Sequence, residues 1–220
     1  MGYSSAQAKE FINKIAPLIV AEGKKRGYKI FSTVIAQAII ESASGTSSLG
    51  YKYHNYFGLK CGSSWKGKSV NLRTKEEYTV GTLTSIRDNF RVFDSMAEGV
   101  AGYYDFISTK RYANLKTAHT AQEYAERLKA DGYATSSTYV NTLVSTVKKY
   151  NLTKYDTGAI EYFPKYQDSL VNALNAVGAD SSYNYRKRIA VKNGISNYSG
   201  TADQNTKLLS LLKEGKLIKP

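Results

Sequence analysis

The segment from Ser32 to Glu41 constrains the fold more than any other part of the chain. Its apolar residues lie on every side of a helix, at Val34, Ile35, Ala36, Ala38, Ile39 and Ile40. A helix that is apolar all round belongs inside a protein, so we predict a buried central helix with Ser32 as its N-cap. The run is interrupted by Gln37 and is far shorter than the roughly 20 residues that cross a bilayer, so it predicts no transmembrane segment. It ends at Glu41, and an ionised carboxylate beside buried apolar residues is costly unless it has a partner or a task.

Helical periodicity flanks this segment on both sides. Before it, the apolar spacing predicts one helix that ends near Pro17 and a second that begins there, because proline suits the first turn of a helix. After it, Ser95 and Thr120 are predicted caps of the first two of three helical patterns, at Met96–Ile107, Ala121–Lys129 and Tyr139–Tyr150.

The residues between these helices have a different texture. From about 51 to 93, glycines separate short β-prone pieces such as Ser69–Leu72, Tyr78–Val80 and Phe90–Phe93. This pattern predicts a small twisted antiparallel element. We therefore expect an α+β fold that is mainly helical, with a small β lobe.

The last part of the chain is predicted to be a separate module. Periodicity lapses around Tyr155, and three short helical patterns follow near Ser169–Val177, Tyr185–Lys192 and Ala202–Lys213. We predict a first domain over residues 1–154, a linker over 155–166 and a small all-α module over 167–220. A module of this size is at the lower limit for independent folding.

Charge and cysteine content narrow the function. The formal net charge of +13 predicts an acidic partner, such as nucleic acid, anionic lipid or the anionic polymers of a bacterial wall. No helix-turn-helix, zinc-finger or RNP signature accompanies the charge, which disfavours nucleic acid. With Cys61 as the sole cysteine and only two histidines, we predict no intrachain disulfide, no metal site and no cofactor.

Carboxylates remain the best chemical option, because the chain offers no HExxH, GxSxG or P-loop pattern. Glycosidic bond cleavage uses a carboxylic acid in an apolar setting to protonate the leaving oxygen, and Glu41 has that setting. A second carboxylate would serve the opposite face of the sugar, with Glu76 and Glu77 of the β lobe as candidates, of which strand alternation places one on the cleft face. The alternative to a catalytic role is, for Glu41, a structural hydrogen bond at the end of its helix. For Glu76 and Glu77 it is a strand whose side chains are solvated.

Several ordered motifs resemble those of one enzyme family. They are Phe11–Pro17, Ala36–Ser42 followed by Gly45, Asn55–Lys60, Phe90–Ser95, and Tyr133–Thr135 with Tyr139. Over about residues 4–152 the chain resembles the glycoside hydrolase family 73 endo-β-N-acetylglucosaminidases, which include flagellar and autolytic peptidoglycan hydrolases.

The resemblance implies a lysozyme-like catalytic domain with a cleft between the helical and β lobes. It implies a peptidoglycan hydrolase that cleaves the β-1,4 bond between N-acetylglucosamine and N-acetylmuramic acid, with Glu41 as the general acid. Glu77 matches the family pattern for the second carboxylate, since Tyr78, Gly81 and Phe90 follow at the expected intervals, and Glu76 is the second choice. The mechanism is inverting or assisted by the acetamido group of the substrate.

The resemblance also implies substrate-binding residues, at Asn55, Phe57, Tyr133 and Tyr139. The aromatic rings would stack on sugar, and the tyrosine hydroxyls would bind the acetamido group or orient a carboxylate. For Trp65, Tyr103, Tyr104 and Tyr112, packing in the core is favoured over sugar contact. Where relatives have Gly-Trp-Gly after the glutamate-serine pair, this chain has Ala43-Ser44-Gly45, which removes an aromatic surface near the cleft.

The C-terminal part is similar to short modules of clostridial and phage cell-wall lytic enzymes. This implies binding of residues 167–220 to the bacterial cell wall, with Arg186, Lys187 and Arg188 meeting anionic wall polymer and Tyr183, Tyr185 and Tyr198 meeting sugar. For any single one of these residues, a solvated basic face is favoured. We expect a monomer.

The start of the chain lacks the apolar stretch of a signal peptide. For a phage or prophage lysin we expect release through a phage-made membrane lesion or carriage on a virion. Otherwise the protein would be secreted with a signal that this sequence lacks. Rival functions are cleavage of the other glycan bond, by a muramidase or lytic transglycosylase, and a non-catalytic basic protein that binds the wall.

Overall fold

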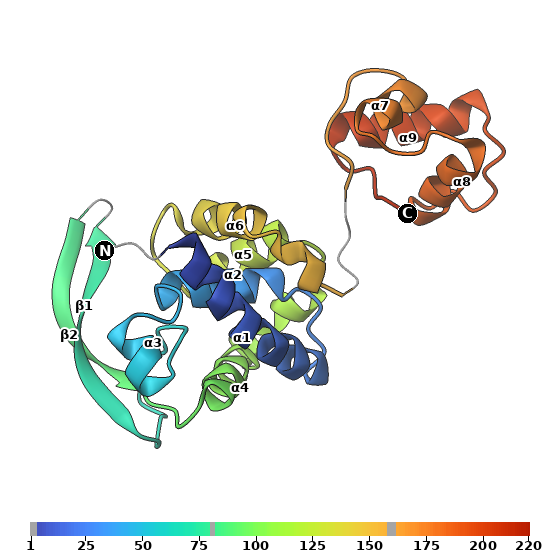
Figure 1. The fold of residues 1–220 in the computed structure, drawn as a ribbon. Coiled ribbons are helices and arrows are strands. Elements are labelled where there is room, and N and C mark those ends of the chain that lie inside the picture. Colours follow the sequence, from blue (N-terminus) through green and yellow to red (C-terminus); the bar gives the residue numbers. More distant parts are fainter. Residues whose placement is uncertain (1–3, 80–81, 158–161) are drawn as a thin grey trace. The chain divides into compact units, whose positions relative to one another are not determined.

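The computed structural model describes residues 4–79, 82–157 and 162–220, with the side chains of 75–79, 82 and 83 left outside the description. The chain divides into two compact units, Met1–Ala159 and Ile160–Pro220. Unit 1 contains α1 (Ser5–Lys25), α2 (Ser32–Glu41), α3 (Ser48–Tyr53), β1 (Ser69–Thr79), β2 (Thr82–Arg91), α4 (Met96–Ile107), the 3-10 helix η1 (Lys110–Thr117), α5 (Ala121–Ala130), α6 (Tyr139–Lys149) and the 3-10 helix η2 (Leu152–Tyr155) (Figure 1). Unit 2 contains α7 (Leu170–Ala176), α8 (Tyr183–Lys192) and α9 (Ala202–Glu214). The expected α+β, mainly helical class is confirmed.

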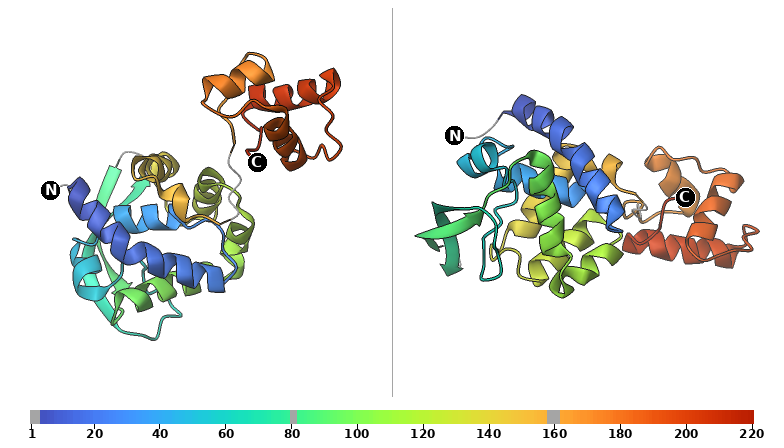
Figure 2. Two further views of the ribbon diagram at one scale, coloured as in Figure 1. Left: turned by 45° about the vertical axis from the view of Figure 1, so that its right-hand side comes forward. Right: turned by 90° about the horizontal axis from the view of Figure 1, so that it is seen from below.

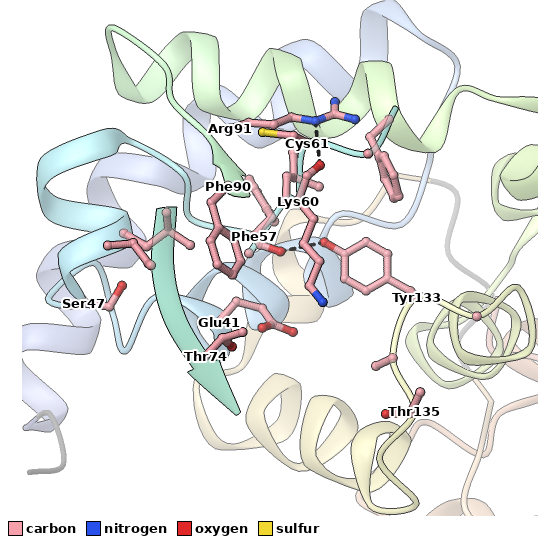
Figure 3. Close-up of a pocket in the computed structure, with 18 of the residues that line it drawn as sticks. Glu41, Ser47, Phe57, Lys60, Cys61, Thr74, Phe90, Arg91, Tyr133 and Thr135 are labelled. Atoms are coloured by element: carbon pink, nitrogen blue, oxygen red, sulfur yellow. Dashed lines mark hydrogen bonds between the residues drawn. The ribbon is translucent and has the colours of Figure 1, made fainter. Parts of the chain in front are cut away.

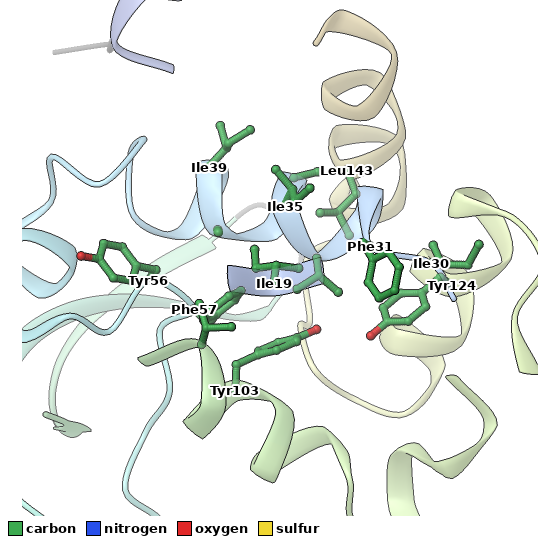
Figure 4. Close-up of a cluster of buried hydrophobic side chains, with 14 of the residues drawn as sticks. Ile19, Ile30, Phe31, Ile35, Ile39, Tyr56, Phe57, Tyr103, Tyr124 and Leu143 are labelled. Carbon is green, nitrogen blue, oxygen red and sulfur yellow. The ribbon is translucent and has the colours of Figure 1, made fainter. Parts of the chain in front are cut away.

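Helix α2 forms the centre of unit 1. All of its residues from Ser32 to Ile39 are buried, and it contacts α1, α5 and α6. Figure 4 shows core side chains on more than one side of it, among them Ile19 of α1, Tyr103 of α4 and Leu143 of α6. The predicted buried central helix is therefore confirmed.

The cap of α2 comes from a distant part of the chain. Ser32 is not the N-cap, as the sequence predicted, but the first helical residue, and Phe31 at the cap position makes no side-chain cap bond. Instead, Asp156 Oδ1 accepts hydrogen bonds from the backbone N–H groups of Phe31 (2.6 Å) and Ser32 (2.7 Å), and Oδ2 accepts one from the Ser32 hydroxyl (2.7 Å). The pKa of Asp156 is raised above its ordinary value, because the effect of burial outweighs the opposite effect of these hydrogen bonds. Asp156 belongs to unit 1, although the sequence predicted it within the linker.

Helix α1 continues through Pro17, contrary to the predicted break. Its buried residues form one stripe across the proline, at Ala8, Phe11, Ile12, Ile15, Ala16, Ile19 and Gly23. Pro17 itself is exposed, as is Asn13 one turn earlier, whose carbonyl loses its usual helical donor. Because that carbonyl faces water and the apolar stripe stays continuous, packing outweighs the cost of about 3 kcal/mol for an interior proline.

The predicted small antiparallel element is a single hairpin, whose strands are longer than the short β-prone pieces of the sequence. Strands β1 and β2 pair antiparallel, from Ser69 opposite Arg91 to Thr79 opposite Thr82, with an irregularity between Glu77 and Thr79. A bridge between Lys60 and Phe90 joins its base to the preceding loop. Figure 2 shows the hairpin at one side of unit 1, next to α3.

Helices α4 to α9 lie at their predicted positions, whereas α3, η1 and η2 were not predicted. The two predicted caps, Ser95 and Thr120, are confirmed. The side chain of Ser95 accepts from the Glu98 N–H at the start of α4, and Thr120 accepts from the Glu123 N–H at the start of α5. Unit 2 has an apolar core of its own, made of Phe163, Leu170, Ala173, Leu174, Ile189, Ala190, Tyr198, Leu208, Leu212 and Leu217. None of the helices in the described ranges is both long and apolar enough to span a bilayer.

Candidate active site

A large open cavity lies in unit 1, with a volume of about 1220 Å³. Its wall is built by the end of α2, the loop over residues 57–64, both strands of the hairpin, α4 and the segment 132–136. This volume exceeds the roughly 300–1,000 Å³ of a site for a drug-sized molecule. The cavity therefore suits an extended ligand such as a segment of a polymer.

Glu41 projects into this cavity from the last residue of α2. Its side chain is half-buried, and it converges with those of Lys60 and Tyr133 on the same space (Figure 3). Gly58 lies against the carboxylate in a left-handed conformation (φ 66°), and a Cβ added there would stand 3.5 Å from Glu41 Oε2. A glycine at this position thus provides the turn, and any other side chain would contact the carboxylate.

A buried hydrogen-bond chain runs from the core to the cavity next to Glu41. The Tyr103 hydroxyl donates to Gln37 Oε1 (2.6 Å), and Gln37 Nε2 donates to the Tyr139 hydroxyl (2.9 Å). Gln37 lies one turn before Glu41 on α2, and Tyr139 lines the cavity. Because the Tyr139 oxygen accepts from Gln37, its own proton is left for an acceptor on the cavity side.

The electrostatics keep this hydroxyl protonated. Burial raises the pKa of Tyr139, and the negative charge of Glu41 raises it further. The pKa of Tyr133 is also raised by burial, then by Tyr139 and Glu41. Both tyrosines therefore stay neutral beside Glu41, and Tyr139 is the one whose proton is available to the cavity.

Tyr133 joins the loop 57–60 to the aromatic wall of the cavity. Its hydroxyl donates to the carbonyl oxygen of Phe57 (2.9 Å), the bond drawn in Figure 3. Its ring is nearly parallel to that of Tyr139, with 6.4 Å between centroids, and meets the rings of Phe106 and Tyr112 edge-on. Adjacent aromatic faces of this kind can stack on the apolar faces of sugar rings.

Of the residues predicted to bind substrate, Phe57 lines the cavity and Asn55 does not. Phe57 lines the cavity floor, and its ring stacks on Tyr103 in the core at 4.1 Å. Asn55 is buried and does not line the cavity. Its amide donates to the carbonyls of Leu59 and Arg91 and accepts from the Leu59 N–H, each at 2.9 Å. Since these bonds use its side chain to join the loop to the hairpin, Asn55 positions the cavity wall instead of contacting a ligand.

The second carboxylate stays a prediction. The backbones of Glu76 and Glu77 lie in β1, opposite Thr84 and Leu83, but both side chains fall outside the described ones. Among the described lining residues, Glu41 is the single carboxylate. Within the described ranges, no three His, Cys, Asp or Glu side chains gather where they could hold a metal ion.

Basic residues of the cavity were not predicted from the sequence. Lys60, Arg73, Arg91 and Arg111 line it, of which Lys60 and Arg91 lie in the family motifs Asn55–Lys60 and Phe90–Ser95 without a predicted role. The Arg91 guanidinium lies over the rings of Trp65 (4.7 Å) and Phe106 (5.4 Å).

Cys61 also lines the cavity, and burial raises the pKa of its thiol. Tyr103 and Tyr104 are buried in the core, as expected. Tyr112 is buried but also lines the cavity, and Trp65 is partly buried against the core.

Known proteins are similar to this chain in sequence. Peptidoglycan hydrolase FlgJ of Salmonella typhimurium is 34% identical over 121 residues, which are 53% of this chain and 38% of that protein. Exo-glucosaminidase LytG of Bacillus subtilis is 34% identical over 131 residues, which are 57% of this chain and 45% of that protein. The chain thus spans less than half the length of these curated relatives.

A solved structure and a family model extend the likeness. The catalytic domain of the autolysin Auto from Listeria monocytogenes superposes with a TM-score of 0.58 at 30% identity, over 71% of this chain and 91% of that domain. The expected lysozyme-like fold is confirmed by such neighbours. The sequence model of the glucosaminidase family, described as mannosyl-glycoprotein endo-β-N-acetylglucosaminidase, matches residues 16–152. This match covers more than half of the chain, which also has the buried helix α2 and the cavity described above. The chain therefore belongs to the glucosaminidase family, glycoside hydrolase family 73.

Proposed function

We propose that this protein is a peptidoglycan hydrolase that cleaves the β-1,4 bond on the reducing side of N-acetylglucosamine, with Glu41 as the general acid. The observation that carries the proposal is the position of Glu41, which a buried helix holds at the wall of a large cavity beside two protonated tyrosines. A carboxylic acid placed in this way can protonate the leaving glycosidic oxygen. Tyr139 is placed to donate its hydroxyl proton either to Glu41 or to the acetamido carbonyl of the sugar.

For the second carboxylate we propose Glu77, with Glu76 as the second choice. The two residues are neighbours in β1, and strand alternation predicts that only one of them serves the cleft face. A carboxylate on the other side of the sugar would activate water or stabilise the positive charge that develops at the anomeric carbon. Glu77→Gln and Glu76→Gln, measured side by side, identify which residue acts, because only the acting one loses turnover.

We also propose that unit 2 holds the enzyme at the bacterial wall. Residues 158–220 carry a net charge of +4, and Lys187 and Arg188 of α8 are exposed. Anionic wall polymers would bind such a surface, with an affinity that falls as salt rises. Deletion of residues 160–220 should weaken sedimentation with cell walls, and unchanged sedimentation would refute this role. Release through a phage-made lesion stays a prediction.

The products of digestion test the activity. Purified peptidoglycan is digested, the new reducing ends are reduced with borohydride, and the fragments are identified by mass spectrometry. Glucosaminitol ends support the proposal, muramitol ends indicate a muramidase, anhydro-muramic ends indicate a lytic transglycosylase, and the absence of products indicates a binding protein.

A matched pair of variants tests the role of Glu41. Glu41→Gln removes the transferable proton and should lower kcat by about 10²- to 10⁴-fold. Glu126→Gln is the control, since Glu126 is exposed on α5 and contacts Gln122 rather than the cavity. Normal turnover by Glu41→Gln would refute the assignment.

A further inference from the structure

Among the described residues, the lining of the cavity is strongly basic apart from Glu41. Four cationic side chains line it, those of Lys60, Arg73, Arg91 and Arg111, against the single described carboxylate. Lys60 has a carboxylate partner in Asp88 at 3.0 Å. For the two arginines on the aromatic side of the cavity, Arg91 and Arg111, no ion pair with a described carboxylate occurs.

Arg91 is a half-buried cation held by rings instead of by an anion. Its guanidinium lies between Trp65 and Phe106, and its Nε donates to the carbonyl of Lys60 (3.0 Å). Burial lowers its pKa, which shows that the surroundings only partly compensate its charge. A guanidinium removed from water in this way gains most from an anion that arrives with a ligand.

Arg111 flanks the same group of rings from the other end. Its Nε donates to the backbone carbonyl of Asp131, and its guanidinium lies 5.6 Å from the centre of the Tyr112 ring. Gly132 supplies the space for this guanidinium, because a Cβ there would collide with Nη2. The Tyr112 and Phe106 rings are 5.3 Å apart, so the two arginines border one aromatic surface in the cavity wall.

We propose that Arg91 and Arg111 form a carboxylate-binding subsite, and that this subsite selects glycan strands whose sugars carry peptides with free carboxylates. The inference rests on the proposed function and names the part of the substrate that the basic wall recognises. A guanidinium matches a carboxylate with two parallel hydrogen bonds, and the rings between the arginines offer an apolar surface to the intervening peptide. Neutral polymers of N-acetylglucosamine would leave both guanidinium groups unpaired.

Amidated peptidoglycan tests the subsite. Carboxyl groups of purified, phosphate-free peptidoglycan are converted to amides with a carbodiimide and ammonia, which keeps glycan and peptide in place. The measured quantity is the ratio of kcat/KM on native substrate to kcat/KM on amidated substrate, for the wild type, Arg91→Gln, Arg111→Gln and Lys110→Gln. Lys110 is the matched control, since it is exposed next to Arg111 and does not line the cavity.

The comparison among variants separates the subsite from the general effect of charge. Because the whole chain is basic, amidation should weaken every variant. The subsite predicts that Arg111→Gln and Arg91→Gln each lower the native-to-amidated ratio by roughly 10-fold, the loss expected for a charge-assisted hydrogen bond, whereas Lys110→Gln keeps the wild-type ratio. The exposed Arg111 allows this test even if the packed Arg91 variant fails to fold. Equal ratios in Arg111→Gln and Lys110→Gln would overturn the subsite.

A binding assay keeps failure of the subsite distinct from failure of the proposed activity. Sedimentation with native and amidated peptidoglycan is measured in the Glu41→Gln background, where turnover does not interfere. If no variant releases reducing ends, the proposed activity fails, and the binding ratios of Arg111→Gln and Lys110→Gln still decide the subsite. A lower ratio for Arg111→Gln supports it, and identical ratios refute it.

Discussion

Substitution of Asp156 is expected to destabilise the helix that carries Glu41. Its carboxylate accepts three hydrogen bonds, two from backbone N–H groups at the start of α2 and one from the Ser32 hydroxyl. Loss of an ordinary N-cap costs about 0.5–2 kcal/mol. Here Asp156→Ala also leaves the donors of the buried residues Phe31 and Ser32 unpaired, so we expect a loss of about 2–4 kcal/mol in the free energy of unfolding. For a unit of this size the loss corresponds to a decrease of about 4–16 °C in Tm.

Asp156→Asn is the matched control. The amide oxygen can accept both backbone bonds, and the amide nitrogen can donate to the Ser32 hydroxyl, so the geometry is kept while the charge is removed. We expect a change within about 1 kcal/mol. Denaturant unfolding followed by fluorescence measures unit 1 alone, because the sole tryptophan, Trp65, lies in it. Equal losses for the two variants would show that charge matters rather than the hydrogen bonds, and a loss below about 0.5 kcal/mol in the alanine variant would refute the cap.

The same residue predicts a dependence of stability on pH. Burial raises the pKa of Asp156 above its unfolded value, so the folded protein binds this proton more tightly than the unfolded chain. The contribution of the group to stability is present below the unfolded pKa and is lost as pH rises through the folded pKa. Asp156→Asn should lack this component when unfolding is measured across that acidic window, and identical pH profiles would contradict the assignment.

Two further substitutions test the immediate support of Glu41. Gly58→Ala and Gly27→Ala both place a side chain at positive φ, and each should cost about 1–2 kcal/mol in stability. Only Gly58→Ala should also lower kcat, because only its Cβ contacts the Glu41 carboxylate. Equal kcat in the two variants would contradict this contact. Gln37→Glu replaces the amide that donates to Tyr139 by a carboxylate that can only accept. The kcat should therefore fall near neutral pH and recover toward acidic pH, as the new carboxyl is protonated. A pH–kcat profile parallel to that of the wild type would argue against a role of Gln37 in orienting Tyr139.

Local signals in the sequence predicted the features that depend on neighbouring residues. The all-round apolar pattern of α2 identified the buried helix, and the serine and threonine caps at Ser95 and Thr120 lie where their spacing indicated. Features that depend on distant residues were missed. The exposure of Pro17 lets α1 continue, and Asp156 displaces Ser32 as the cap of α2, because tertiary contacts override local preference.

The site followed the same rule. Glu41, singled out by its local apolar setting, lines the cavity together with Tyr133 and Tyr139 of the family motifs, and their roles stay predictions. Asn55 has the chemistry of either a ligand-binding or a structural residue, and only its surroundings show that its bonds go to backbone. The position of Arg111 depends on rings from α4 and η1, which no single stretch of sequence reveals.

The cap of α2 has a consequence for synthesis of the chain. Asp156 is translated 125 residues after Phe31, and at a synthesis rate of 5–20 residues per second this takes about 6–25 s. During that interval α2 can form, but Asp156 is not yet present to accept hydrogen bonds from the N–H groups at its start. The helix that carries Glu41 is thus capped only when nearly all of unit 1 has been translated. A fragment that stops at residue 152, where the family match ends, would lack Asp156 and leave the start of α2 without this cap.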